Sequence, residues 1–387
     1  MFVFKKDLSN ATSYKYVRSC PFHFFKYLPF LFKKMTLSFL LSNKQNRKVG
    51  LHMELKQINE SQNVAKTAPE PSPRTYLTQN EIATLLEISP QAASIYASKL
   101  DLKPYRQQNK SAYSPFAVRK FLQARGFAYP KEVIAFQMLK GGSTKTSSAF
   151  NLAIRLNQYG AKVLCIDLDM QGNLSDALGV EVTEDHALFI HIARGEATIE
   201  ETIVPICEGL DLIPSEFENS TLDYELSSKR KNLASFVRSE LDKIRDKYDF
   251  IIIDCNPALS SLNISIALAS DRIVIPVNPD RFSKRGLAKT ITELERVGID
   301  YKQTMEFSLL YTLYDARESS SQKYLIEYGS TYRDRLLSTV IKRNTDVKNA
   351  IDQKKSIFDF PRAPAREDFD LVARELLGWR KELQGNA

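Results

Sequence analysis

The feature that most constrains this sequence is the segment KGGSTKTS at residues 140–147. A strand-like apolar run, 133–138, comes before it, and a helix-like run, 149–158, comes after it. A loop between a strand and a helix N-terminus is where proteins bind phosphate, because backbone N–H groups converge there. This loop also supplies a lysine to offset phosphate charge and a threonine hydroxyl to hold magnesium. The sequence therefore predicts a site for a nucleoside triphosphate.

The segment departs from the commonest phosphate-binding pattern, G-x-x-x-x-G-K-[ST], at both glycines. Leu139 and Thr144 stand at the two glycine positions, and an additional lysine, Lys140, precedes the glycine pair. A side chain at Thr144 is strained if the backbone there needs a positive φ. We therefore expect a variant loop whose turnover is slowed or tuned and not abolished.

Residues 130–387 alternate strand-like and helix-like runs, which is typical of a parallel α/β sheet. The strand-like runs are 133–138, 162–167, 250–254 and 272–277, with a weaker one at 210–213. Asp167 ends one run, with Asp169 just after it, and Asp254 ends another. Acids at the carboxyl ends of parallel strands face the crevice where such sheets bind ligands. We expect a doubly wound, mostly parallel sheet with these acids near the loop.

The net charge of +8 does not by itself indicate nucleic-acid binding, because it is unevenly placed. Residues 1–52 carry ten basic residues and one acid, so the other 335 residues sum to −1. The four cysteines are widely spaced and indicate neither a disulfide framework nor a C-x-x-C metal site. This cysteine usage fits a reducing cytoplasm.

Residues 1–52 are rich in aromatic residues but contain no uninterrupted apolar span of about 18 residues, which argues against a transmembrane helix. No small-residue cleavage site follows a compact apolar region. We expect a non-functional or disordered extension, with Met53 as the working start. Residues 53–75 are expected to form a helix and a linker. The linker is indicated by Pro69, Pro71 and Pro73.

Residues 76–128 show short helical periods, which predict a small winged helix-turn-helix domain. Thr78 can cap a first helix with Glu81 three residues later, and a short turn leads to a second helix at 91–100. The polar stretch at 106–110, which Tyr113 follows, suits a β-wing that touches phosphates. The side chains placed to face a DNA major groove are Gln91, Ser94, Ser98 and Lys99. Any helix pair with a tight turn gives a similar pattern, so the residues alone leave DNA recognition and simple packing open.

These motifs together resemble the ParA family of partition ATPases, within the ParA and MinD group of deviant P-loop proteins. The resemblance covers about residues 131–383. Its motifs are the loop at 140–146, DLDMQGN at 167–173 and DCNP at 254–257, with further similarity at 275–280, 314–317 and 340–344. With a helix-turn-helix in front, the chain is similar to the larger plasmid-type members, which couple partition to repression of their own operon.

The resemblance implies ATP or ADP with Mg²⁺ as cofactors and a nucleotide-sandwich homodimer. Lys145 would contact the β- and γ-phosphates, and Thr146 would ligate magnesium. Lys140 would reach across the dimer to the other subunit's phosphates, as a lysine version of an arginine finger. The implied nucleotide-binding set is Lys140, Gly141, Gly142, Ser143, Thr144, Lys145, Thr146 and Ser147.

The acids also receive roles from the resemblance. Asp169 would position the attacking water, Asp167 would support the metal shell, and Asp254 would hold a magnesium-bound water. The implied catalytic set is Lys140, Lys145 and Asp169, and the implied metal set is Thr146, Asp167 and Asp254. Met170 stands where the family usually has proline, and this is the second departure besides Thr144.

The resemblance implies a slow ATPase that dimerises on ATP and binds nucleoid DNA without sequence preference. A ParB-like centromere-binding partner would stimulate hydrolysis and release it. Lys342 and Arg343 are the candidate contacts for non-specific DNA, and a solvated loop is the alternative for the lysines that follow them. In the ADP or apo form, the protein would bind its operator through the helix-turn-helix. The expected location is the cytoplasm, on the nucleoid and not on a membrane.

Three related enzyme classes fit less well. A membrane-cycling, MinD-like positioning ATPase would end in a basic amphipathic helix, whereas 369–383 has a mixed pattern that favours a helix packed on the sheet. A nitrogenase-type reductase needs cluster-binding cysteines, and an arsenite-type pump needs two phosphate-binding loops. A transcriptional repressor with weak or no ATPase activity stays open.

Overall fold

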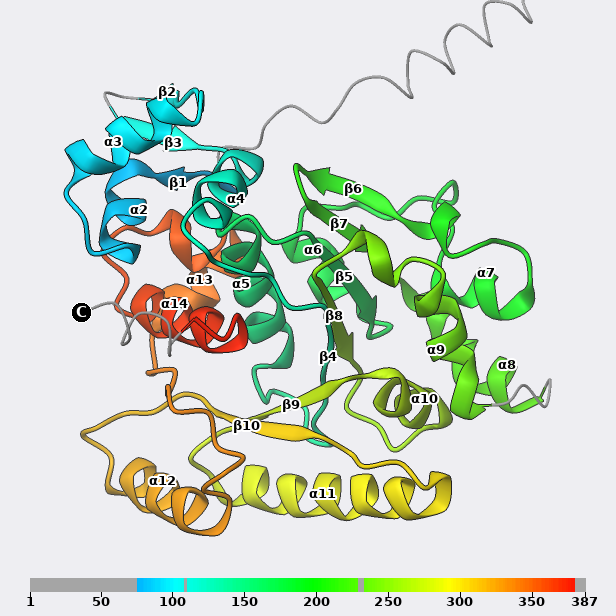
Figure 1. The fold of residues 1–387 in the computed structure, drawn as a ribbon. Coiled ribbons are helices and arrows are strands. Elements are labelled where there is room, and N and C mark those ends of the chain that lie inside the picture. Colours follow the sequence, from blue (N-terminus) through cyan, green and yellow to red (C-terminus); the bar gives the residue numbers. More distant parts are fainter. Residues whose placement is uncertain (1–74, 108–109, 229–232, 380–387) are drawn as a thin grey trace, which may run out of the picture. The chain divides into compact units, whose positions relative to one another are not determined.

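The computed structural model describes residues 75–107, 110–228 and 233–379 (Figure 1). The expected extension at 1–52, the Met53 start and nearly all of the expected linker at 53–75 lie outside these residues. Within the described ranges, no helix is long and apolar enough to cross a membrane.

In the described part of the chain, a seven-stranded sheet has the order β10-β9-β4-β8-β5-β7-β6 (Figure 1). Its strands are β4 (Glu132–Phe136), β5 (Val163–Leu168), β6 (Val204–Cys207), β7 (Leu210–Ile213), β8 (Phe250–Cys255), β9 (Arg272–Val277) and β10 (Phe307–Tyr311). Neighbouring strands are parallel, except that β6 is antiparallel to β7. The predicted mostly parallel sheet is therefore confirmed, and each of the five predicted strands occurs.

Helices cover both faces of this sheet. They are α5 (Lys145–Gln158), α6 (Asn173–Ala177), α7 (Phe189–Arg194), α8 (Leu222–Ser228), α9 (Leu233–Asp242), α10 (Ser261–Ala269), α11 (Arg281–Tyr301), α12 (Ser319–Thr331), α13 (Thr345–Asp352) and α14 (Ala365–Leu376). Successive side chains of a strand point to opposite faces, so alternate residues of β4 enter different cores. Ile134 and Phe136 pack in one cluster with α5 and α14, and Val133 and Ala135 pack in another with α9 and α10. This is the doubly wound arrangement that the sequence predicts.

A smaller module precedes the sheet. It consists of β1 (Leu77–Thr78), α2 (Gln79–Leu85), α3 (Pro90–Lys99), β2 (Tyr105–Gln107), β3 (Lys110–Tyr113) and α4 (Pro115–Gln123). Its strands form an antiparallel sheet in the order β1-β3-β2. The predicted capping box is confirmed, because Thr78 caps α2 and its N–H donates to the Glu81 carboxylate at 3.0 Å. The assignment of this module as a DNA-binding domain stays a prediction, and so do the domain boundaries.

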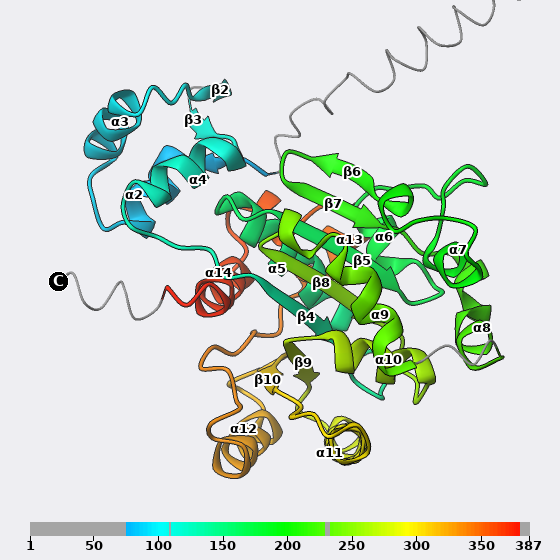
Figure 2. The same cartoon turned by 45° about the vertical axis from the view of Figure 1, so that its right-hand side comes forward.

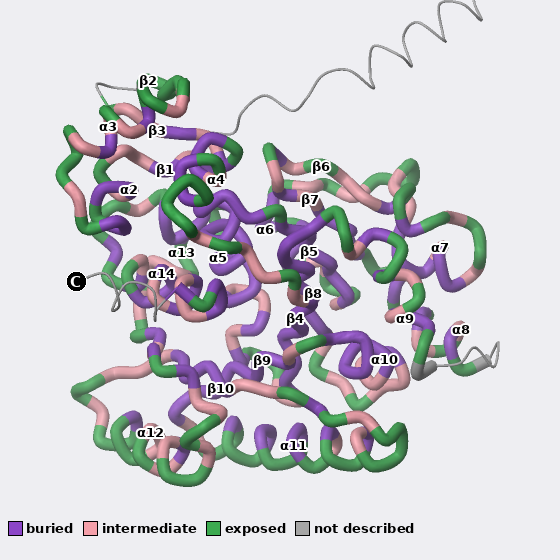
Figure 3. The backbone as a smooth tube through the Cα atoms, in the orientation of Figure 1, coloured by how far each residue is buried: buried purple, intermediate pink, exposed green. Residues whose placement is uncertain are grey.

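Buried side chains of the module continue into the α5 face of the central sheet as one apolar cluster. Figure 3 colours the buried residues of both parts purple along the backbone. The last described helix belongs to the same cluster. Phe369, Val372 and Leu376 of α14 and the following Trp379 are at most 4% exposed. The apolar face of α14 is therefore packed inside the fold, as the sequence predicts, and residues 380–383 of the predicted tail helix lie outside the described residues.

Candidate nucleotide-binding site

The predicted phosphate-binding loop joins β4 to α5, which begins at Lys145. The first N–H groups of a helix have no partner within the helix, so the α5 N-terminus presents donors and a partial positive charge to this loop. Gly141 and Gly142 border open space, because a Cβ added at either would meet no other atom within 4 Å. The loop backbone is therefore open to a phosphate group.

Thr144 adopts the left-handed conformation, with φ 62° and ψ 17°. The position therefore does require a positive φ, which costs a β-branched residue about 1–2 kcal/mol. Side chains from the ends of β9 and β10 support the loop. The Thr144 hydroxyl lies 2.9 Å from that of Thr312, which donates to Asn278 Oδ1 at 2.7 Å, and Asn278 Nδ2 donates to the Gly142 carbonyl at 3.2 Å. A glycine at 144 could not make the first of these contacts. The threonine is therefore strained in its backbone but gains a hydrogen bond to Thr312.

Lys145 is only 7% exposed, and it lies beside the carboxyl end of β8. The next residue, Thr146, donates its hydroxyl to Asp254 Oδ2 at 2.5 Å. The other oxygen, Asp254 Oδ1, is buried and has no hydrogen-bond partner among the described residues. A hydroxyl and an unpaired carboxylate oxygen fit a magnesium ion, which prefers oxygen ligands and retains several waters. Within the described residues, no group of three His, Cys, Asp or Glu could hold a metal ion, so phosphate oxygens would complete its shell.

Asp167 is fully buried and stands directly opposite Asp254 in the β5–β8 pairing. Its Oδ2 accepts from the Ser175 N–H at 2.9 Å and the Ser175 hydroxyl at 2.8 Å. Its Oδ1 accepts from the Asp169 N–H at 3.2 Å. Asp167 thus fixes the turn that carries Asp169, and its predicted part in the metal shell stays a prediction.

Asp169 lies partly exposed in the turn after β5, where its Oδ1 accepts from the Gln171 N–H at 3.1 Å. Met170 beside it is 40% exposed. The turn closes at Gly172, whose φ is 61° and where an added Cβ would come within 2.7 Å of the Ser215 carbonyl oxygen. Only glycine fits there, so the DLDMQGN motif holds Asp169 on the open side of the crevice.

Lys140 contacts its own chain. Its Nζ donates to both carboxylate oxygens of Asp280, at 2.9 and 2.8 Å. Asp280 also caps α11 by accepting from the Ser283 N–H at 2.8 Å. Gly286 lets α11 approach the loop, because a Cβ there would lie 3.2 Å from Lys140 Cβ. For Lys140 to serve another subunit, as the resemblance implies, it would have to leave Asp280.

The sequence patterns gave no role to Asn278, Asp280 or Thr312. All three follow the carboxyl ends of β9 or β10, which are parallel to β4 and therefore end on the same side of the sheet as the loop. The signal that could have found the first two is their position after β9, in the family-like segment 275–280. Their partners lie more than 130 residues away in the chain. The sequence alone therefore cannot pair them with the loop.

The predicted DNA contacts lie in two separate places. On α3, Gln91, Ser98 and Lys99 are exposed and Ser94 is partly exposed. The other two, Lys342 and Arg343, form ion pairs with Asp368 at 2.9 Å and with Glu318 at 2.8 Å. Their positive charges are thus offset within the chain, and their role in DNA binding stays a prediction. The expected wing corresponds to the antiparallel pair β2 and β3, in which Tyr113 packs in the module's core at 3% exposure. Its contact with phosphates stays a prediction.

Burial shifts the titration of the two paired acids. Burial raises the pKa of Asp254 to about 8, and the charge of Asp167 adds to the rise. Burial also raises the pKa of Asp167, to about 6. A site with two buried acids is therefore unfavourable for negative charge until a cation enters it.

We expect the nucleotide-free protein to lose stability as the pH rises from about 4 to about 8, through Asp254. A carboxyl whose folded pKa exceeds its unfolded pKa holds more protons when folded, so its stabilising effect is fully present below the unfolded pKa and is lost as the pH rises. Asp254→Asn should remove up to about 1.4 kcal/mol per pH unit of this dependence, measured by urea unfolding. Asp352→Asn, at an exposed acid, is the control. Equal pH dependence in the wild type and Asp254→Asn would contradict the expectation.

Comparison with known proteins gives relatives that this chain spans almost completely. A family model described as an AAA domain matches residues 131–307. The chromosome partitioning protein ParA of Caulobacter vibrioides is 29% identical over 265 residues, covering 67% of this chain and 99% of the relative. The sporulation initiation inhibitor protein Soj of Bacillus subtilis is 30% identical and covers 63% of this chain and 98% of the relative. A ParA family protein of Chlamydia trachomatis is 33% identical, and the match covers 64% of this chain and 97% of the relative.

Solved structures share the fold. McdA of Cyanothece in complex with ATP has a TM-score of 0.59 at 22% identity, covering 65% of this chain and 98% of that chain. Cobyrinic acid a,c-diamide synthase of Mycobacterium smegmatis with ADP and magnesium has a TM-score of 0.56 at 23% identity, covering 65% and 95%. At these identities, the likeness establishes the fold alone.

The mostly parallel sheet, with its phosphate-binding loop between β4 and α5, has the α/β fold of the P-loop nucleoside triphosphatases. The sequence relatives narrow this class further. The chain belongs to the ParA family of partition ATPases.

Proposed function

We propose that this protein hydrolyses ATP with magnesium, forms an ATP-dependent homodimer on nucleoid DNA in the cytoplasm, and separates plasmid or chromosome copies. A ParB-like centromere-binding partner stimulates hydrolysis and releases the dimer from DNA. In the ADP or apo form, the module before the sheet binds operator DNA and represses the protein's own operon. The observation that carries the proposal is the contact between Thr146 and Asp254 beside Lys145, with Asp254 Oδ1 left unpaired.

The loop and the acids beside it divide the tasks of this reaction. The backbone N–H groups at the α5 N-terminus and the Lys145 ammonium hold the β- and γ-phosphates and offset their charge. Thr146 and Asp254 would hold the magnesium ion, which would supply charge neutralisation at the phosphate oxygens. Asp169, on the open side of the crevice, orients the attacking water.

Two large apolar side chains near the loop are exposed. Leu259, which follows β8, is 63% exposed, and Phe282, at the start of α11 next to Asp280, is 68% exposed. A dimer formed across the loop would cover them, although single exposed apolar side chains do not by themselves require a partner. A second copy that covers them would also bring its own Lys140 near the first copy's nucleotide.

The test is a gel-shift series with operator DNA and random DNA, in ADP and in ATP, alongside a magnesium-dependent hydrolysis assay with and without DNA and the partner. We expect ATP to favour random DNA and ADP to favour the operator. If nucleotide changed neither complex, the switch would be wrong. If hydrolysis were absent under all conditions, the ATPase would be wrong and the repressor alternative would remain.

Asp280→Asn is expected to increase the fraction of ATP-dependent dimer. Asparagine still caps α11, but it removes the charge that holds Lys140 on its own chain. The pair is partly exposed, so its value is at most about 1 kcal/mol, which corresponds to about fivefold per subunit. Sedimentation with a non-hydrolysable ATP analogue measures the dimer constant. Asp300→Asn, which removes an exposed pair with Arg296 at the other end of α11, is the control. An unchanged or weaker dimer in Asp280→Asn would show that this pair does not restrain Lys140.

A further inference from the structure

The outward face of α3 carries one large apolar side chain among polar ones. Ala93 and Ala97 are at most 2% exposed and face the module's core. The opposite face carries Gln91, Ser98 and Lys99, and Ile95 lies among them with 59% of its surface exposed. The helix contains no acidic residue. A lone large apolar side chain on a polar, non-acidic helix face has no role in packing this chain.

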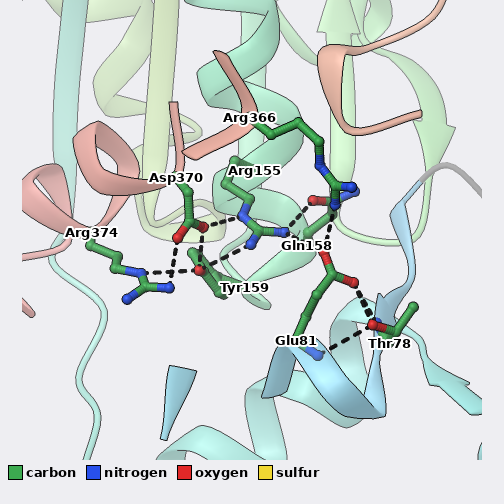
Figure 4. Close-up of polar contacts among 8 residues, drawn as sticks. All are labelled: Thr78, Glu81, Arg155, Gln158, Tyr159, Arg366, Asp370 and Arg374. Carbon is green, nitrogen blue, oxygen red and sulfur yellow. Dashed lines mark hydrogen bonds and ion pairs between the residues drawn. The ribbon is translucent and has the colours of Figure 1, made fainter. Parts of the chain in front are cut away.

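The module is attached to the rest of the chain through α2, on the side of the P-loop helix. Figure 4 shows Arg155 of α5 between Glu81 of α2 and Asp370 of α14. Glu81 lies 3.4 Å from Arg155 and 3.0 Å from Arg366. Arg155 donates to Asp370 at 2.5 Å and is itself only 5% exposed. These buried and half-buried ion pairs fix the orientation of α2.

A second attachment holds α4. Arg119 of α4 pairs with the Asp249 carboxylate through both terminal nitrogens and donates to the Gly160 carbonyl at 3.0 Å. Glu208 accepts from the Ser114 hydroxyl at 3.0 Å and from the Phe116 N–H at 2.6 Å, at the start of α4. None of the described residues of α3 donates or accepts a hydrogen bond to the sheet-containing part of the chain, nor pairs with it. Helices α2 and α4 are thus the attached helices, and α3 lies on the outer side of the module (Figures 1 and 2).

We propose that Ile95 is a specificity-determining residue that contacts the C5 methyl group of a thymine in the operator. The inference rests on the operator binding proposed above. In a helix-turn-helix, the second helix lies in the major groove, and apolar side chains there recognise the thymine methyl. Gln91, one turn earlier, is placed to pair with an adenine edge. The two residues are about 5–6 Å apart along one face, so the two bases lie one or two base pairs apart.

DNA fits this surface better than a second protein copy. A protein interface needs a core of several apolar side chains, whereas α3 exposes one, flanked by a glutamine, a serine and a lysine. The cation and the absence of carboxylates on α3 also match a phosphate-rich partner. The geometry therefore assigns Ile95 to a base edge.

The experiment uses thymine-to-uracil replacement, which removes only the methyl group. The full-length protein with ADP is footprinted on DNA upstream of its own gene, and each thymine in the footprint is then replaced singly by deoxyuridine. We expect one thymine per half-site whose replacement weakens wild-type binding about fourfold, as for one buried methyl group. Ile95→Ala should bind thymine and uracil sites equally, with the weaker affinity. Ile299→Ala, which removes a 77% exposed isoleucine on α11, should keep the wild-type ratio.

The outcomes separate the two levels of the proposal. A specific complex in which uracil is neutral at every position, or in which Ile95→Ala keeps the discrimination, overturns the role of Ile95 alone. Absence of any specific complex overturns operator binding and the role of Ile95 together. Ile95 is exposed, so Ile95→Ala should keep the wild-type melting temperature, and a loss of binding with unchanged melting and retained discrimination would point to a contact between copies.

Discussion

Replacing Lys145 by alanine is expected to lower magnesium-dependent ATP hydrolysis by about a hundredfold to a thousandfold. A loss of this size is typical when one preorganised charge-stabilising donor is removed from an active site. Lys145 is 7% exposed at the first position of α5, next to the carboxylate of Asp254, so no solvent-exposed lysine can substitute for it. Release of phosphate under single-turnover conditions measures the chemical step directly.

The matched control for this variant is Lys131→Ala. Lys131 precedes the same strand, β4, at the end away from the loop, and its Nζ pairs with Asp246 at 2.9 Å on the surface. We expect its turnover to stay within about twofold of the wild type, because exposed ion pairs contribute about 1 kcal/mol or less. If the Lys145→Ala variant were as active as the wild type and melted at the same temperature, Lys145 would have no role in the reaction.

The sequence predicts the nucleotide-binding loop well because its constraints are local. A strand-like run at 133–138, a glycine pair and a helix-like run at 149–158 are all visible within about 25 consecutive residues. The strained position is also visible, since Thr144 stands at a glycine position and its φ is 62°. The contacts that hold Thr144 in this conformation are not visible in the sequence. They come from Asn278, after β9, and Thr312, after β10.

Two strands of the central sheet, β6 and β10, are not predicted from the sequence, and the physical reasons differ. The strand β6 carries Pro205 and lies at the edge of the sheet, where a residue without an N–H costs no ladder hydrogen bond. The strand β10 lies at the opposite edge of the sheet, after the long helix α11. Its parallel pairing with β9 is long-range and leaves no local signal.

The orientation of the module also depends on long-range contacts. The capping box of Thr78 and Glu81 is predictable, but the same Glu81 carboxylate also contacts Arg366, which is 285 residues away in the chain. Likewise, Ile95 looks in the sequence like one of the apolar residues of its helix. Only the packing of Ala93 and Ala97 shows that Ile95 faces outward.

Arg155→Met is expected to lower the free energy of unfolding by about 3 kcal/mol, because breaking a buried ion network strands uncompensated charges. Arg155 lies between Asp370 and Glu81, and burial works against its charge while Tyr159, Asp370 and Glu81 raise its pKa. The loss falls at the lower end of the usual range because Asp370 keeps its pair with Arg374 at 2.6 Å. Urea unfolding measures the change.

The control for Arg155→Met is Arg296→Met, which removes a 54% exposed arginine and its pairs on α11. This variant should lose about 1 kcal/mol or less. Hydrogen exchange locates the damage, and we expect loss of protection in α2 as well as at the C-terminal end of α5. A change confined to α5 would show that Glu81 is held without Arg155.

A second substitution separates charge from packing in the Arg155 network. The guanidinium also stacks on the rings of Tyr159 and Phe358, at 4.5 and 4.8 Å from their centroids. If charge compensation dominates, Arg155→Met combined with Asp370→Asn should be less destabilised than the sum of the single variants, by about 1 kcal/mol or more. If stacking dominates, methionine replaces much of the lost contact and the two effects should add. Because one arginine serves both the P-loop helix and the module, an additive result would mean that apolar packing, and not the ion network, joins them.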